Sequence, residues 1–190
     1  MRTATINRKT NETNIDLEFN LDGSGKYQID TKIPFFNHML EQFTKHGSFD
    51  LKIKLDGDMD SHHIVEDLGI CLGEAIKKTV GDKKGIKRYG TAKIPMDDAL
   101  AEVIIDICNR AYLYQNLNFN VEKCDDLDLE VFPEFFRAVA TEAKITIHIS
   151  QIRGNNAHHI IESIFKAFGA ALDDACLIVG DEVRSTKGVL

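Results

Sequence analysis

The residues best suited to chemistry form a His-His-x-x-Glu pattern that occurs twice, as HHIVE at residues 62–66 and as HHIIE at residues 158–162. Four of the seven histidines in the chain lie in these two copies. Neutral imidazoles together with a carboxylate are ligands that suit first-row transition metals. The pattern therefore predicts two metal sites, or one shared site, built by an internally duplicated fold.

The duplication extends beyond the two copies of the pattern, which lie 96 residues apart. The same offset places Phe36 on Phe132 and His38 on Glu134. Both members of the second pair can bind a metal, and each lies 24 residues before its His pair. A period this long does not suit a solenoid repeat. It predicts two similar half-domains packed into one body, covering about residues 1–87 and 88–190.

The elements that must position these residues follow from the hydrophobic pattern. Alternating apolar residues predict strands, and apolar residues at a spacing of three or four predict helices. Each half then contains strands, a helix, a strand and a helix, which predicts an α+β fold whose antiparallel-rich sheets carry helices on one side. We expect strands at residues 4–8, 14–21, 51–55, 91–94, 99–106, 112–121 and 145–149, and helices at 34–45, 62–80, 132–143 and 157–176.

Each His pair falls near the start of a predicted helix, where adjacent side chains point about 100° apart and cannot easily share one ion. We expect each ion to take one His from each pair, one helix Glu and one residue of the upstream helix. This pairs Glu66 with His38 and Glu162 with Glu134, and leaves open which imidazole binds which ion. Nitrogen and oxygen ligands with two open octahedral positions favour Mn²⁺, with Fe²⁺ or Zn²⁺ as substitutes. The predicted ligands are His38, His62, His63, Glu66, Glu134, His158, His159 and Glu162.

Composition narrows the class of protein. The chain is 43% hydrophobic and 28% charged, which is ordinary for a globular protein, and no apolar stretch suits a membrane span. Its net charge of −7 argues against nonspecific binding to nucleic acid. Its start shows no secretory signal, and its four scattered cysteines suit a reducing compartment, so we expect a cytoplasmic protein. His46 and His148 lie outside the repeated pattern and are expected to be structural or surface residues.

Several further segments are specific when they occur together: FNHML at 36–40, RYG at 88–90, PMD at 95–97 and STKG at 185–188. With the two His-rich segments, they resemble the imidazoleglycerol-phosphate dehydratase family of histidine biosynthesis over nearly the whole chain. The resemblance implies a duplicated fold like the second domain of a small-subunit ribosomal protein. It also implies a shell of 24 identical subunits with sites at subunit contacts. Glu134 stands where many members have His.

The resemblance also implies an activity, the dehydration of imidazole glycerol phosphate to imidazole acetol phosphate with two Mn²⁺ ions per site. We hypothesise that the substrate ring is held as imidazolate between the two ions, which helps to expel the C3 hydroxyl and acidifies C2–H. Glu12 is then the principal acid/base candidate and Asp97 the second. Arg153 and Lys166 are candidate supporting charges. Phosphate binding is assigned to Arg88, Arg110, Ser185, Thr186 and Lys187.

Two other classes of protein suit the metal ligands. A dinuclear metallophosphatase would release inorganic phosphate, whereas a dehydratase forms a ketone and keeps its phosphate. A metal-storage or scaffold protein would bind ions without turnover, and it would need neither Glu12 nor the Ser-Thr-Lys segment.

Overall fold

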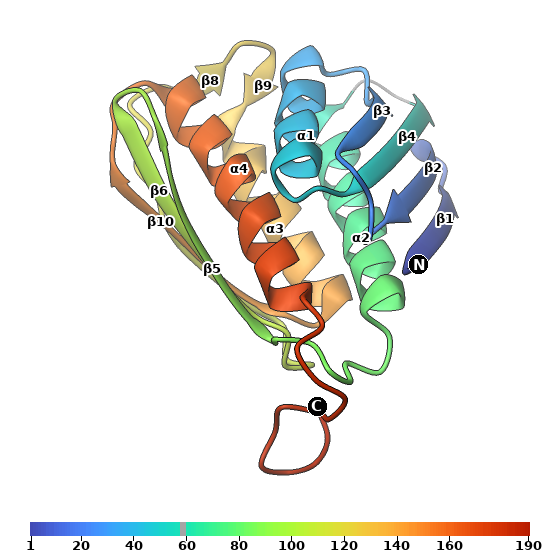
Figure 1. Cartoon of the computed structure of the whole chain (residues 1–190). Coiled ribbons are helices and arrows are strands. Elements are labelled where there is room, and N and C mark those ends of the chain that lie inside the picture. The colour runs from blue at the N-terminus through green and yellow to red at the C-terminus, as the bar shows by residue number, and fades with distance from the viewer. Residues whose placement is uncertain (58–59) are drawn as a thin grey trace.

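The computed structural model of the chain describes residues 1–57 and 60–190, which form two four-stranded sheets with four long helices between them (Figure 1). The first half contains β1 (Thr3–Lys9), β2 (Thr13–Asn20), β3 (Lys26–Asp30), α1 (Pro34–His46), β4 (Asp50–Gly57) and α2 (Ser61–Val80). The second half contains β5 (Tyr89–Met96), β6 (Ala99–Asp106), β7 (Tyr112–Asn116), β8 (Lys123–Cys124), β9 (Leu127–Asp128), the 3₁₀ turn η1 (Leu129–Val131), α3 (Phe132–Ala143), β10 (Thr146–Arg153) and α4 (Ala157–Cys176).

The two sheets share one topology, which confirms the predicted α+β fold with an internal duplication. Their strand orders are β1-β2-β4-β3 and β5-β6-β10-β7. In each sheet three strands pair antiparallel, and the last edge strand pairs parallel with its neighbour. The helices lie on one face of each sheet, as expected, and pack against each other in the middle of the molecule (Figure 1).

Alternation along the strands decides which face is buried. In β2 the side chains of Ile15, Leu17 and Phe19 are buried, while the residues between them are exposed. Side chains of successive strand residues point to opposite faces, so one face of the sheet covers the helices and the other meets solvent. No helix among the described residues is long and apolar enough to cross a membrane.

The helices pair across the two halves. α1 packs on α4, and α2 packs on α3. Glycines permit the close approach at both crossings: a Cβ on Gly169 of α4 would lie 2.3 Å from the carbonyl oxygen of Phe43 in α1. A Cβ on Gly73 of α2 would lie 2.9 Å from the carbonyl oxygen of Val139 in α3. Side chains on α1 therefore meet the start of a helix from the other half.

The helices α2 and α4 begin at capping residues that fix the first turn. Asp60 accepts a hydrogen bond from the backbone N–H of His62, and Asn156 accepts one from the backbone N–H of His159. Short polar side chains are preferred at this position because they satisfy otherwise unpaired N–H groups. Both caps occupy the same place relative to their His pair, so both pairs lie at one end of the helix layer.

Three details differ from the sequence expectations. The strand expected at residues 112–121 ends at Asn116, and β3 and the β8–β9 hairpin were not anticipated. In β3 no residue is buried, so the strand lacks the apolar alternation by which strands are recognised. The hairpin strands have two residues each, which is too short for any periodicity.

Candidate active site

Three predicted ligands meet at the crossing of α1 and α4. His38 of α1, His158 and Glu162 offer ligand atoms that all lie within 4.8 Å of one another. His38 Nε2 is 3.6 Å from Glu162 Oε2, and His158 Nε2 is 3.3 Å from the same oxygen. Metal–ligand bonds of about 2.0–2.2 Å place two donors of one ion about 3–4.4 Å apart. The group therefore fits a single divalent ion.

The pairing of helices corrects one expectation. We expected His38 to share an ion with Glu66, but the structure places His38 beside Glu162 of the other half. The reason is the crossing of α1 on α4, which the repeat in the sequence does not reveal. Glu134, expected beside Glu162, instead lies 3.4 Å from the Arg137 guanidinium on its own helix.

The Glu162 carboxyl group is buried and lies against a lysine. Its side chain is 7% exposed, and its Oε1 lies 2.8 Å from Lys166 Nζ, one helical turn later. Burial by itself raises the pKa of the Glu162 carboxyl, but the hydrogen bond and charge of Lys166, with smaller contributions from His38 and His158, lower it below the ordinary value. The carboxylate is therefore ionised, and Oε2 faces the two imidazoles. Lys166, one of the supporting charges suggested beside the phosphate-binding residues, thus lies at this carboxylate and not among the residues that line the hollow described below.

The corresponding residues of the first half are more open. His62 Nε2 lies 3.6 Å from Glu66 Oε2, and the two side chains are 54% and 49% exposed. Within residues 1–57 and 60–190, no third His, Cys, Asp or Glu completes a similar group around them. The first-half set is thus half-formed within one chain.

The second histidine of each pair faces an acidic residue on a hairpin turn. His63 Nε2 lies 3.9 Å from Glu12 Oε1, in the turn between β1 and β2. His159 Nε2 lies 3.5 Å from Asp97 Oδ2, in the turn between β5 and β6. The two acid/base candidates therefore occupy equivalent places in the two halves. Their spacing in the sequence differs from 96 because the first three strands of the two halves are offset by 86 residues, as Thr3 and Tyr89 at the starts of β1 and β5 show. The longer link between β7 and α3 brings the later elements to the offset of 96, so a comparison at that offset could not pair Glu12 with Asp97.

Two acidic residues beside the histidines were not anticipated. Asp98 Oδ1 is 2.7 Å from His159 Nδ1, and its other oxygen accepts the backbone N–H groups of Asn155 and Asn156. These hydrogen bonds, first that of Asn155 and then that of His159, lower the pKa of Asp98 to about 2. Asp125 Oδ2 is 3.1 Å from His158 Nδ1. Neither residue follows the 96-residue repeat, so no sequence signal marked them.

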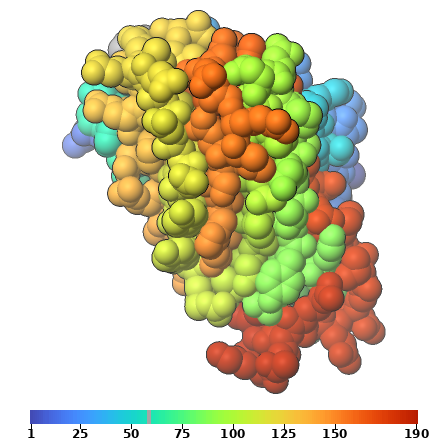
Figure 2. All heavy atoms as spheres, turned by 90° about the vertical axis from the view of Figure 1, so that its left-hand side faces the viewer, coloured from blue at the N-terminus to red at the C-terminus, as the bar shows by residue number. Residues whose placement is uncertain are grey.

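The predicted phosphate-binding residues also come together, in an open hollow of 1110 Å³ at the opposite end of α4. The backbone N–H of Arg88 donates to the carbonyl of Ala175 near the end of that helix. The guanidinium of Arg88 is held by Asp106 at 2.7 Å, and it donates to the carbonyl of Arg184. Figure 2 shows the C-terminal segment gathered at this end of the molecule. The predicted residues that line the hollow are Arg88, Arg110, Ser185, Thr186 and Lys187.

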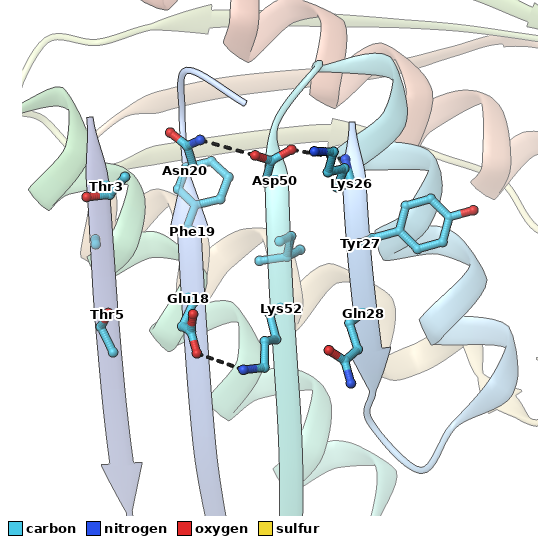
Figure 3. A pocket seen from close by; sticks show the side chains of 12 residues that line it. Thr3, Thr5, Glu18, Phe19, Asn20, Lys26, Tyr27, Gln28, Asp50 and Lys52 are labelled. Atoms are coloured by element: carbon cyan, nitrogen blue, oxygen red, sulfur yellow. Dashed lines mark hydrogen bonds and ion pairs between the residues drawn. The ribbon is translucent and has the colours of Figure 1, made fainter. Parts of the chain in front are cut away.

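Other features agree with structural roles. His46 and His148 are both exposed, and His148 packs against Tyr112 and Tyr114 on the outer face of the second sheet. A shallow hollow of 480 Å³ on the outer face of the first sheet contains no predicted site residue. Two of its charged side chains pair with each other, Lys52 with Glu18 at 3.0 Å, and Asp50 accepts a hydrogen bond from the backbone N–H of Lys26 (Figure 3).

Comparisons with known proteins agree with this arrangement. A family model described as imidazoleglycerol-phosphate dehydratase matches residues 31–172. The protein of that name from Thermodesulfovibrio yellowstonii is 53% identical to this chain, and the match covers all of both chains. The protein of that name from Geobacillus thermodenitrificans is 51% identical, and the match covers all of this chain and 99% of that protein. The crystal structure of the dehydratase from Staphylococcus aureus is 41% identical with a TM-score of 0.84, covering 93% of this chain and 99% of that one. That of the Pyrococcus furiosus enzyme in complex with (S)-C348 is 37% identical with a TM-score of 0.86, covering 97% and 100%. The chain therefore belongs to the imidazoleglycerol-phosphate dehydratase family of hydro-lyases.

Proposed function

We propose that this chain dehydrates imidazole glycerol phosphate to imidazole acetol phosphate and water in histidine biosynthesis, and that it uses two Mn²⁺ ions per active site. Fe²⁺ or Zn²⁺ are the expected substitutes. The observation that carries the proposal is the group formed by His38, His158 and Glu162, whose donors suit one ion. The partly formed set at His62 and Glu66 repeats the same donor types and would hold the second ion.

The residues divide the chemistry between them. Bound divalent ions would supply Lewis-acid activation of the substrate ring, favouring its imidazolate form. Glu12 would carry the proton to or from the substrate carbon, with Asp97 as the second candidate. Both carboxylates are at least half exposed, so a substrate can reach them. The arginines, Ser185, Thr186 and Lys187 would bind the phosphate group.

The distance between the two parts of the site supports an oligomer. The His-rich set lies at the start of α4 and the phosphate hollow at its end (Figure 1). A helix of 20 residues is about 30 Å long. A substrate with a three-carbon chain is far too short to join them. We therefore propose that each active site combines the His-rich set of one chain with the phosphate hollow of another, in a homo-oligomer of 24 subunits.

Reconstitution tests the reaction. Metal-free protein should form ketone from imidazole glycerol phosphate when Mn²⁺ is added, and elemental analysis should then find two ions per chain. Release of inorganic phosphate without ketone would instead indicate a metallophosphatase. Ion binding without turnover would indicate a storage protein.

Mixing two inactive variants tests the shared site. Glu162→Gln removes a metal ligand, and Arg110→Ala removes a phosphate contact from a side chain that is 67% exposed. Each variant alone should be nearly inactive. When the two are unfolded together and reassembled, some sites would combine intact parts, so activity should return. Persistent inactivity of a mixed assembly with native mass would contradict a site shared between chains.

A further inference from the structure

A short hairpin between β7 and α3 has no counterpart in the first half. The link from β7 to α3 consists of residues 117–131, whereas the link from β3 to α1 consists of residues 31–33. The strands β8 and β9 lie within this longer link, and Asp125 and Asp126 form the tip between them. The hairpin lies beside the starts of α1 and α4 (Figure 1). It is therefore an addition to one half only, at the end of the molecule that carries the His-rich set.

The tip of the hairpin contacts both helices that carry the set. Asp126 Oδ1 accepts a hydrogen bond of 3.1 Å from the backbone N–H of Phe35 in the first turn of α1. The N-cap residue of α1, Ile33, makes no side-chain hydrogen bond to this turn. Asp125 Oδ2 lies 3.1 Å from His158 Nδ1 at the start of α4. One contact anchors the hairpin, and the other reaches a predicted metal ligand.

The two nitrogens of His158 face different partners. Nδ1 faces the Asp125 carboxylate, and Nε2 lies 3.3 Å from Glu162 Oε2. Both partners are carboxylates, which only accept hydrogen bonds, but only the Nδ1–Asp125 contact has hydrogen-bond geometry. The proton of the neutral ring therefore belongs on Nδ1 and the lone pair on Nε2. Hydrogen bonds of this kind orient metal-binding imidazoles and raise their basicity. We propose that Asp125 is a positioning residue, which holds His158 with Nε2 free to bind the ion beside His38 and Glu162.

The backbone of Asp125 supports a role for its side chain. Its φ is +52°, in the left-handed region where glycine is the favoured residue and Asp is only tolerated. A strained conformation that places a carboxylate against a predicted ligand is typical of functional sites. His159 also has a carboxylate at Nδ1, but this one belongs to Asp98 in the turn between β5 and β6, at 2.7 Å. Both imidazoles on α4 therefore have a carboxylate at Nδ1.

This inference rests on the proposed function, and Asp125→Gly separates the two. Glycine relieves the positive φ, so the melting temperature of the metal-free assembled protein should stay the same or rise. The loss of the carboxylate should weaken Mn²⁺ binding at one of the two sites by about 10–100-fold, measured by calorimetric titration. Asp125→Asn keeps an oxygen that can accept the Nδ1 proton, and it should recover most of the lost affinity. A purely structural role would lower the melting temperature and the affinity together.

Two control variants complete the test. Asp128→Asn removes a carboxylate from the same hairpin that pairs with Lys123, and it should leave Mn²⁺ affinity unchanged. Cys124 Sγ, Asp125 and His158 also lie within 4.8 Å of one another, so the hairpin itself offers metal donors. Cys124→Ser should bind Mn²⁺ as tightly as the unmodified chain. An equal loss of affinity in Cys124→Ser and Asp125→Gly would overturn the proposal, because both residues would then be direct ligands.

The outcomes distinguish the two levels of inference. Unchanged Mn²⁺ affinity in Asp125→Gly, while Glu162→Gln loses an ion, would overturn the role of Asp125 and leave the proposed function intact. If the unmodified chain binds no Mn²⁺, the proposed function fails, and the positioning role fails with it.

Discussion

The two copies of the His-His-x-x-Glu pattern have the same residues but very different surroundings. The Glu162 side chain is 7% exposed and meets two imidazoles and a lysine, whereas the Glu66 side chain is 49% exposed and lies beside the His62 imidazole. Lys166 corresponds by the 96-residue offset to Ile70, so the first half lacks the same cation. The two copies thus keep the same imidazole and carboxylate donors, while the residues around them differ.

The difference arises from what packs on each helix start. At α4, His38 of α1 and the β8–β9 hairpin both approach the His pair. Against α2 packs α3, where the residue at the offset of His38 is Glu134, which lies beside Arg137. The second-half group is therefore formed by His38, His158 and Glu162 within one chain, whereas among the described residues no third donor joins His62 and Glu66. The comparison separates the type of donor, which both copies share, from the degree to which each group of donors is assembled within the chain.

The strongest test of this comparison substitutes the two glutamates in turn. Glu162→Gln and Glu66→Gln should each lose one ion per chain and about 10³-fold or more in kcat, because an ion stabilises the transition state by several kcal/mol. Only Glu162→Gln should lower the melting temperature of metal-free protein, since it leaves Lys166 without its carboxylate. Equal melting temperatures would show that the difference in burial has no energetic consequence. Full metal content and rate in either variant would contradict its assignment as a ligand.

The next test compares the two hairpin carboxylates. Glu12→Gln should keep both ions and lose about 10²–10⁴-fold in kcat, the usual contribution of an acid/base group. Asp97→Asn should also keep both ions, and its loss in kcat should be smaller than that of Glu12→Gln. Steady-state kinetics with metal analysis of both variants would decide between them. A larger loss in Asp97→Asn would transfer the principal proton-transfer role to the second half.

The helix crossings offer a test through stability. Gly169→Ala should lower the free energy of unfolding by about 2–3 kcal/mol, because its Cβ would meet a backbone oxygen at 2.3 Å. Gly73→Ala should cost about 1 kcal/mol, since its nearest contacts are at 2.8 and 2.9 Å. Urea unfolding of metal-free protein measures both. Gly169→Ala should also weaken metal binding, because it moves α1 and His38 away from α4. Equal costs would show that the two crossings are equally tight.

The smallest expected effect is on pH dependence. Lys166 outweighs burial and holds the pKa of Glu162 below its ordinary value of 4.5. The ionised carboxylate therefore stabilises the metal-free protein above pH 4.5, and this stabilisation is lost as the pH falls through the lowered pKa. In Lys166→Met, burial should raise the pKa, and stability should then be lost as the pH rises through it. Denaturation between pH 4 and 6 should show the stability of the unmodified chain rising relative to that of the variant. Parallel curves would contradict the role assigned to Lys166.

Some of the fold could be predicted from local pattern. The apolar alternation of β2 and the helical spacing of α2 and α4 were sufficient, since each element shows its period over eight or more residues. The edge strand β3 could not be predicted, because it has no buried face and pairs with β4, which lies beyond α1 in the sequence. The hairpin β8–β9 could not be predicted because its strands have only two residues each. The strand expected to reach Val121 ends at Asn116, where its partner β10 no longer pairs with it.

The sequence alone determined which residues are candidates for the chemistry, because imidazole and carboxylate groups repeated at a constant offset are visible without any structure. It also placed both His pairs at helix starts and named the arginines and the Ser-Thr-Lys segment that share one hollow. Only the tertiary structure decided that His38 meets Glu162 rather than Glu66, and that Asp98 and Asp125 face the imidazoles of α4. The physical reason is that these contacts depend on which helices cross, and crossings are set by packing between residues far apart in the chain.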